Sequence, residues 1–251
     1  MLILTGWTSG YAQLPQCGSG STSVFYIISG LGLQVYNPAL PVSPTNPSNV
    51  TVAPVPNPSF GLAIGPNVNT ATPSPTFYLS TGLNQHHYYN GTAWINTGHN
   101  LGAATAYNTA AGGGYVFCIV TGGNNVYRYS GTGNPVLAVT LPAHPLRIPD
   151  LLADCEGNFY TVNAQASLTV PAGIFKYNSN GILLQTIPFT GTLPTVFVNS
   201  GGLASVGNDV FFTMNDTLWK ATISGGSAVV SPHTPFPGFF NDFGSCSMDG
   251  A

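Results

Sequence analysis

Short apolar runs of four to six residues recur along this chain, and none of them has the spacing of an amphipathic helix. The runs are rich in Val, Ile, Phe, Tyr and Thr, and they are separated by Gly-Gly, Asn-Gly, Gly-Asn and Pro. β-Branched and aromatic residues favour strands, whereas Gly, Asn and Pro favour the turns between them. The pattern therefore predicts an all-β protein.

The predicted strands fall into groups of four, and each group opens with small residues and continues with aromatic ones. The groups start near residues 60, 104, 151 and 202, a period of roughly 40 to 50 residues that is typical of a β-propeller blade. Small first strands suit the crowded central channel, and bulky middle strands suit blade-on-blade packing, so we expect most aromatic residues in the core. The predicted strands are 59–64, 76–80, 87–91 and 93–95; 103–107, 114–120, 125–129 and 136–141; 151–154, 158–162, 173–177 and 182–187; and 202–205, 209–213, 217–221 and 228–230.

The two ends of the chain supply a further blade. Residues 23–28, 33–36 and 50–55 read as its second, third and fourth strands, and residues 239–246 offer the missing first strand. We therefore expect one β-propeller domain over residues 17–251, closed by pairing of its N- and C-terminal strands. It has about five four-stranded blades, or six if a spacer contains a degenerate copy.

Charge changes this picture, because residues 1–127 contain no Asp, Glu, Lys or Arg and the first charge is Arg128. Charged residues make up 4% of the chain, against about 25% in ordinary soluble domains. Net charge normally keeps folded proteins apart, so this composition favours association. Four basic residues cannot neutralise a nucleic-acid backbone. No apolar stretch reaches the roughly 18 residues of a membrane-spanning helix.

Residues 1–16 form a separate apolar segment. Met1 to Gln13 look like the end of a secretory signal that lacks its basic region, with a plausible cleavage point near Ala12 or Gln13. Alternatively the segment is retained as a strand that pairs with a neighbouring subunit. Export agrees with the even number of cysteines and with three sequons, so we expect a secreted, extracellular or cell-surface glycoprotein. The candidate glycosylation sites are Asn49, Asn90 and Asn215.

The four cysteines suggest disulfides. Cys17 precedes the first N-terminal strand and Cys246 lies on the closing strand, so a bond between them would lock the ring where its ends meet. Cys118 and Cys155 fall on neighbouring blades and would form the second pair. Four cysteines allow three connectivities, so these pairs are one hypothesis among three.

Four motifs resemble the secreted propeller domains in surface and adhesion proteins of gliding-type bacteria. They are the 154–160 turn, the 173–177 strand, the 201–204 opening and the closing residues 241–246. The resemblance covers residues 150–250, and the first half shares only the period. In that family the propeller usually lies within a longer modular protein, whereas this chain ends just after the closing strand. The resemblance implies a bacterial surface location, and the early end makes self-assembly more attractive.

Candidate metal ligands are few. Asp150, Asp154 and Glu156 cluster in the sequence, and carboxylates suit calcium, but the loop lacks the Asp-x-Asp-x-Asp-Gly pattern. His86 and His87 are adjacent on a predicted strand and therefore point to opposite faces. The other histidines stand alone among loop residues. We expect no resident metal and no cofactor.

Catalysis also has few candidates. Asp154 and Asp242 lie on predicted first strands, where two carboxylates at the channel would serve general acid–base chemistry. The favoured alternative is that they bond backbone amides in turns. The sequence contains no nucleophile elbow, phosphate loop or zinc-binding helix motif. These observations predict that the chain is not an enzyme.

Two functions from different classes remain. In the first, the propeller is a structural subunit that polymerises with itself into an extracellular filament, sheath or coat. The Pro/Asn/Ser/Thr-rich spacers 41–58 and 67–75 would then extend across the surface or onto a neighbour. In the second, it is a lectin-like or adhesive module that recognises glycans or a protein partner. Neutral sugars would stack on exposed aromatic residues, for which the candidates are Trp94, Tyr88 and Tyr89.

Overall fold

The described part of the chain forms a ring of antiparallel sheets. The computed structural model describes residues 24–29, 32–43, 46–50, 52–56, 59–70, 75–82, 85–99, 101, 107–120, 123–144, 147–167, 170–191, 193, 200–236 and 240–244. These residues contain strands β1 to β20 and no helix, and so no helix that could cross a membrane. The all-β prediction is confirmed.

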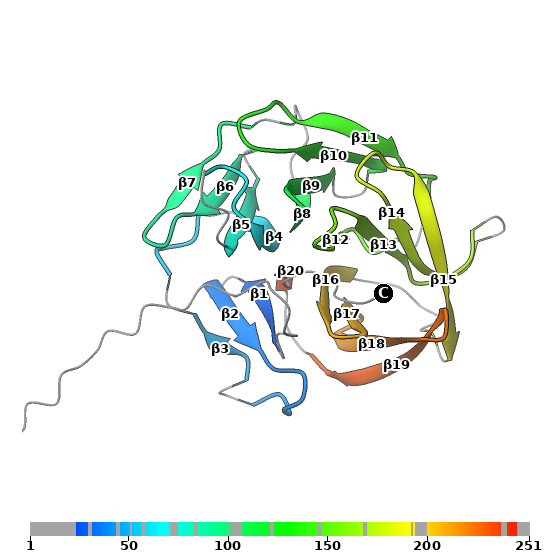
Figure 1. Ribbon diagram of the computed structural model, residues 1–251. Helices are drawn as coiled ribbons and strands as arrows, with labels where there is room; N and C mark the ends of the chain where they lie inside the picture. The colour runs from blue at the N-terminus through cyan, green and yellow to red at the C-terminus, as the bar shows by residue number, and fades with distance from the viewer. Residues whose placement is uncertain are drawn as a thin grey trace, which may run out of the picture.

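Five four-stranded blades surround a common axis (Figure 1). Blade 1 has the strand order β20-β1-β2-β3, and blades 2 to 5 each use four consecutive strands, which confirms the propeller prediction. The bounds for blade 1 are β20 (Phe240–Gly244), β1 (Phe25–Ser29), β2 (Gly32–Tyr36) and β3 (Ser48–Asn49). Those for blade 2 are β4 (Ser59–Pro66), β5 (Pro75–Thr81), β6 (His86–Tyr89) and β7 (Trp94–Asn96). Those for blade 3 are β8 (Tyr107–Gly112), β9 (Tyr115–Val120), β10 (Asn125–Tyr129) and β11 (Val136–Thr140). Those for blade 4 are β12 (Leu152–Ala153), β13 (Phe159–Asn163), β14 (Gly173–Tyr177) and β15 (Leu183–Gly191), and those for blade 5 are β16 (Ser200–Val206), β17 (Asp209–Met214), β18 (Thr217–Ser224) and β19 (Ser227–Pro235).

The ring closes where its two ends meet. β20 pairs with β1 in antiparallel register, with Ile27 opposite Phe243. Phe243 is buried, and its ring lies 5.1 Å from that of Phe25. The predicted pairing of N- and C-terminal strands is confirmed. The proposed Cys17–Cys246 disulfide lies outside the described residues.

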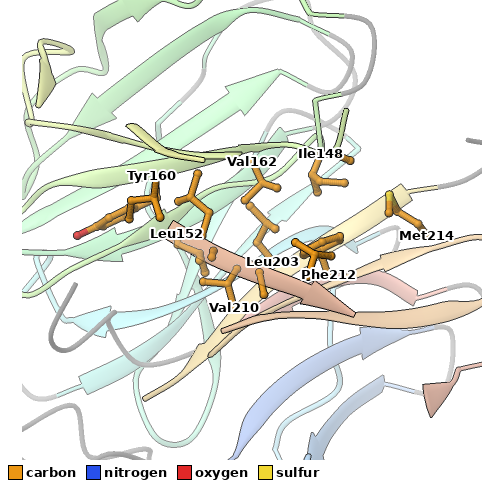
Figure 2. Close-up of a cluster of buried hydrophobic side chains, with 14 residues drawn as sticks. Ile148, Leu152, Tyr160, Val162, Leu203, Val210, Phe212 and Met214 are labelled. Atoms are coloured by element: carbon orange, nitrogen blue, oxygen red, sulfur yellow. The ribbon is translucent and has the colours of Figure 1, made fainter. Parts of the chain in front are cut away.

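Small residues let the inner strands approach one another. A Cβ added at Gly112 would overlap the backbone of Asp154, and one added at Gly65 would overlap Ala111. Larger side chains fill the space between the middle strands, as in the cluster between blades 4 and 5 (Figure 2). There Tyr160 and Phe212 are fully buried. This division between small inner strands and bulky middle strands is the one that the sequence predicted.

Blades 4 and 5 are joined at their outer strands, a feature that the sequence did not predict. Residues Phe189–Gly191 of β15 pair in parallel with Ala228–Val230 of β19, which makes an eight-stranded sheet. β15 continues past the end predicted at residue 187, and this extension supplies the extra pairing. Blades 4 and 5 are therefore joined by backbone hydrogen bonds at the rim, whereas the other described blades form separate sheets.

Two predicted strands differ from the described ones. The described first strand of blade 3 is Tyr107–Gly112, and all of the strand predicted at 103–107 except Tyr107 lies outside the described residues. The fourth strand of blade 1 is Ser48–Asn49 and not 50–55. Val50, Val52 and Val55 instead pack as an extended segment against blades 1 and 2.

Candidate functional site

The central channel is closed by side chains. It is lined by inner-strand residues such as Leu62, Ala111, Leu152 and Phe243, and the cavity among them is about 10 Å³. A single water needs roughly 10–15 Å³, so this cavity has no space for a substrate.

The predicted acidic cluster does not form a cation cage. The Asp150 carboxylate is fully buried and accepts backbone N–H bonds from Leu151, at 2.7 Å, and from Leu203 of blade 5. Asp154 lies in the turn before β13 and accepts bonds from Asn158 and from the Tyr160 hydroxyl, both at 2.8 Å. The described residues contain no group of three His, Cys, Asp or Glu that could hold a metal. Both aspartates thus serve the alternative role of bonding turns and neighbouring blades.

Asp154 remains ionised in this setting. Burial opposes ionisation, but the hydrogen bonds from Asn158 and Tyr160 and the charge of Lys176 outweigh it and lower the pKa of Asp154. The Lys176 Nζ lies 3.4 Å from an Asp154 oxygen. The Glu156 backbone N–H also donates to Asp154, at 3.0 Å. The predicted approach of Asp154 to Asp242 concerns a side chain outside the described set.

A buried polar cluster joins blades 2 and 3. His86 Nδ1 lies 3.7 Å from Cys118 Sγ, and the His86 ring packs edge-on to Tyr129 at 5.9 Å. The His99 ring lies tilted against Tyr129, with ring centroids 4.1 Å apart. Burial, with smaller effects from His99 and His87, lowers the pKa of His86 to about 3, and burial raises the pKa of Cys118. Both groups are neutral at neutral pH, so this cluster is packing rather than a reactive pair.

The proposed disulfide between Cys118 and Cys155 is wrong. Cys118 is a buried thiol in the middle of blade 3, whereas Cys155 is exposed on the turn before β13. The two residues are on neighbouring blades, as predicted, but at different depths. Membership of neighbouring blades does not bring two side chains together.

The candidate sugar-stacking residues form no exposed platform. Tyr89 is 8% exposed and packs against Trp94, with ring centroids 5.3 Å apart. The Trp94 Nε1 donates to the Ala53 carbonyl at 3.2 Å, so the 41–58 spacer lies on its own blade 2 here. Tyr88 is half-buried in the packing between blades 2 and 3. These aromatic residues belong mainly to the core, as the strand pattern suggested.

All three sequon asparagines are exposed. Asn49 lies on the outer strand β3, Asn90 follows β6, and Asn215 lies in the turn between β17 and β18. Glycosylation at these three positions stays a prediction.

A pocket of about 310 Å³ opens on the outside of blade 1, within the size range of ligand sites. It is formed beside β2 and β3 by the loop between them, and one of its walls, Leu40, is 53% exposed. No lining residue carries a formal charge. We call it the blade-1 pocket, lined by Val24, Val35, Asn37, Leu40, Pro41, Ser43, Asn46 and Ser48.

One buried asparagine shapes this pocket. Asn46 is 5% exposed, and its amide group donates to the carbonyls of Asn37, Leu40 and Pro41 at 3.0–3.1 Å. Its Oδ1 accepts the Asn37 N–H at 2.9 Å. The loop is further held by His233 of β19, whose Nε2 lies 3.0 Å from the Pro38 carbonyl. The spacer was predicted to extend across the surface or onto a neighbour, and its described residues here form a wall of the pocket on their own molecule.

A second uncharged apolar surface lies at the rim between blades 3 and 4. In Figure 1 the turn between β14 and β15 reaches the outer strand β11. Arg128 Nη1 donates to the Ser179 carbonyl at 2.6 Å, and a Cβ added at Gly181 would overlap Val139. Both elements also carry large apolar side chains that are exposed. We call them the rim ridge: Val136, Leu137, Ile182, Leu183 and Leu184, each 49–60% exposed.

The fold, its blades and its strand closure define a β-propeller domain. Virginiamycin B lyase from Staphylococcus aureus is similar in structure, with a TM-score of 0.50, 13% identity, and 82% of this chain and 68% of the lyase covered. A chain from the crystal structure of a nidogen/laminin complex has a TM-score of 0.51 and 9% identity, and covers 88% of this chain and 97% of itself. At these identities the similarity extends to the fold alone. No protein-family model and no curated protein matches the sequence.

The comparison contradicts the prediction that this chain is not an enzyme. Virginiamycin B lyase is an enzyme built on a similar propeller. The prediction relied on the scarcity of charge and of sequence motifs, and neither of these is a property that excludes catalysis on this fold. These similar structures confirm the resemblance as far as the propeller fold, and its bacterial surface setting stays a prediction.

Proposed function

We propose that this chain is a secreted, self-assembling propeller that forms an extracellular filament, sheath or coat. The observation that carries the proposal is the pair of uncharged apolar surfaces, the blade-1 pocket and the rim ridge, on a ring with 4% charged residues. Large exposed apolar patches mark interaction sites in soluble proteins. With so few charges, little electrostatic repulsion opposes contact between copies.

Three sequence features support the extracellular setting. The N-terminal segment is signal-like, the sequon asparagines are exposed, and the second half resembles propellers of gliding-bacteria surface proteins. Glycans on Asn49, Asn90 and Asn215 would supply the hydrophilic surface that charge does not. A Cys17–Cys246 disulfide would secure the ring outside the cell.

A second candidate function is a binding module for glycans or a protein partner, which the blade-1 pocket favours. Its volume of about 310 Å³ suits a small ligand, and its Asn37 and Ser43 side chains offer neutral hydrogen-bonding groups beside Leu40 and Pro41. A neutral sugar or peptide needs no opposite charge. This function uses the pocket alone, whereas assembly uses both surfaces.

Sedimentation and negative-stain electron microscopy of the secreted protein, at neutral pH and without ligand, test the proposal. We expect polymers or regular arrays whose size increases with protein concentration. Single rings at all concentrations would contradict assembly. In that case, binding of the single rings to a glycan array, lost in a Leu40→Asp variant, would establish the binding module instead.

A further inference from the structure

We propose that the contact between blades 2 and 3 is an acid-sensitive gate, which opens in mild acid while the rest of the ring stays closed. This inference goes beyond the proposed function and does not depend on it. We call the contact the 2–3 seam. Its buried hydrophobic residues are Ala63 and Tyr78 of blade 2, and Ala111, Val116, Cys118 and Tyr129 of blade 3.

The 2–3 seam contains buried histidines. Among the described residues three histidines are buried, and all of them belong to blade 2 or to the segment that follows it: His86, His87 and His99. His86 reaches across the seam, with Nδ1 3.7 Å from Cys118 Sγ and its ring edge-on to Tyr129. His99 reaches the same tyrosine, and its Nε2 lies 3.0 Å from the Gly131 carbonyl of blade 3. His87 is adjacent to His86 on β6 and therefore points to the opposite face of the blade.

Neither blade supplies an opposite charge for a protonated histidine. Residues 59–140 contain no Asp or Glu, and their one basic residue is Arg128. Its guanidinium lies over the Tyr115 ring and donates to the Ser179 carbonyl, so it is directed towards blade 4. The titratable groups that face His86 are the thiol, hydroxyl and imidazole of Cys118, Tyr129 and His99. A charged imidazole in the closed seam is therefore buried without a carboxylate from either blade, which disfavours closure.

The construction of the 2–3 seam allows it to open by itself. Blades 2 and 3 form separate sheets, so no strand pairing crosses the seam, whereas blades 4 and 5 are joined by the pairing of β15 with β19. Two hydroxyl oxygens, Thr109 Oγ1 and Tyr129 Oη, are buried without a hydrogen-bond partner in the described part of the chain. Thr109 is directly opposite Cys118, so both side chains face the seam. Water would supply the missing hydrogen bonds when the seam opens.

Cys118 provides a reporter of this opening. It is fully buried in the seam, so a thiol reagent should reach it only when the seam opens, whereas Cys155 is exposed. Labelling with dithiodipyridine, a disulfide that reacts with thiols in acid, followed by peptide mass spectrometry gives the rate at each cysteine. The Cys155 rate corrects for the effect of pH on the reagent.

The corrected Cys118 rate should rise as the pH falls. The open seam exposes an imidazole with a pKa of about 6.5, whereas burial keeps His86 neutral in the closed seam. Opening should therefore increase by up to about tenfold per pH unit, or up to about 100-fold between pH 6.5 and 4.5. His86→Gln keeps a polar side chain but takes up no proton, so it should flatten this rise even if it changes the rate at neutral pH.

Two further variants serve as controls. His87→Gln changes the neighbouring residue on the opposite face of β6, so the rise at Cys118 should persist. Val162→Cys places a reporter among the buried residues between blades 4 and 5, where Val162 is fully buried. The cysteine introduced there should stay protected at the lowest pH.

Three results would overturn the inference. A corrected Cys118 rate that stays constant over this pH range would show that the seam does not respond to acid. Equal acceleration at Cys118 and at the cysteine introduced by Val162→Cys would mean that acid unfolds the whole ring. An undiminished rise in His86→Gln would exclude His86 as the sensor. None of these results depends on whether the rings assemble, because Cys118 lies inside each ring.

Discussion

His86 shows how burial decides the behaviour of a single residue in a chain with few charges. Its imidazole lies between Cys118 and Tyr129 in the contact of blades 2 and 3, and burial lowers its pKa to about 3. Unfolded histidine has a pKa of about 6.5. The unfolded chain therefore binds a proton below pH 6.5 that the folded chain does not accept until about pH 3.

The free energy of unfolding should consequently fall as the pH drops from about 6.5 towards 3. The contribution of His86 to this slope is at most about 1.4 kcal/mol per pH unit. Urea unfolding at a series of pH values measures it, and His86→Gln should give a flatter curve than the unmodified chain. Parallel curves for the two proteins would contradict the prediction. An NMR titration of the folded protein checks it independently, because the His86 ring should stay neutral at pH 4.

For single residues, the sequence predicted what a side chain does better than which other residues it contacts. It correctly favoured turn and backbone bonding for Asp154, because a short acidic side chain next to glycine and asparagine is typical of a turn. It did not find the cluster of His86, Cys118, Tyr129 and His99, because these residues come from four separate segments. Nor did it distinguish the buried Asn46 from its many exposed neighbours. That difference depends on the path of the whole 37–47 loop.

The turn between β8 and β9 shows how individual elements are fitted to the ring. Gly113 and Gly114 both have positive φ, at 55° and 81°, and together they connect the two strands in a two-residue hairpin. Only Gly113 touches the next blade, because a Cβ added there would overlap the backbone of Gly157. A Cβ on Gly114 would meet nothing within 4 Å.

The two glycines therefore make a matched pair of substitutions. Gly114→Ala should lower the free energy of unfolding by about 1–2 kcal/mol, the conformational cost of a left-handed alanine. Gly113→Ala carries the same cost and also forces blades 3 and 4 apart, so it should be worse by at least about 2 kcal/mol. Guanidinium unfolding of both variants measures the difference. Equal losses would mean that the turn, and not the contact between blades, sets the cost.

Elements were the scale at which the sequence was most informative. Short apolar runs, Gly-Gly and Asn-Gly turns and the repeat of four strands every 40 to 50 residues located most strands to within a few residues. The failures have a physical cause. Small residues suit both 103–107 and the observed β8, and valines at 50–55 suit both a strand and a packed extended segment. The parallel pairing of β15 with β19 joins two blades and has no local signal at all.

At the scale of the whole molecule, apolar packing carries the stability that charges provide elsewhere. The described residues contain two ion pairs between side chains, Lys176 with Asp154 and Lys220 with Asp209, at 3.4 and 3.7 Å. The second pair is about 30% exposed and contributes little. Salt weakens interactions between exposed charges but has much less effect on apolar burial.

The stability of the single ring should accordingly be almost independent of KCl. Between about 0.05 and 1 M KCl we expect the free energy of unfolding to change by less than about 1 kcal/mol. Urea unfolding at a protein concentration at which sedimentation shows single rings measures this. A loss of several kcal/mol in high salt would show that the few charges contribute more than their number suggests.

The whole ring was predictable because its closure is visible at both ends of the sequence. The N-terminal residues predicted a blade without its first strand, and residues 239–246 predicted a strand that belonged to no other blade. The sequence therefore indicated that the two segments pair. The exposed apolar surfaces were not predicted, because which side chains stay exposed depends on how the strands and loops pack.

The position of β20 also affects how the protein is made. β20 is the innermost strand of blade 1, yet the ribosome synthesises it after all the strands of the other four blades. While the chain is growing, β1 therefore has an uncovered edge beside the axis. The closed ring can form only once β20 has left the ribosome tunnel, so β1 and the uncharged N-terminal half must avoid other chains until then. A nascent chain of this kind is a natural substrate for chaperones that shield exposed strands.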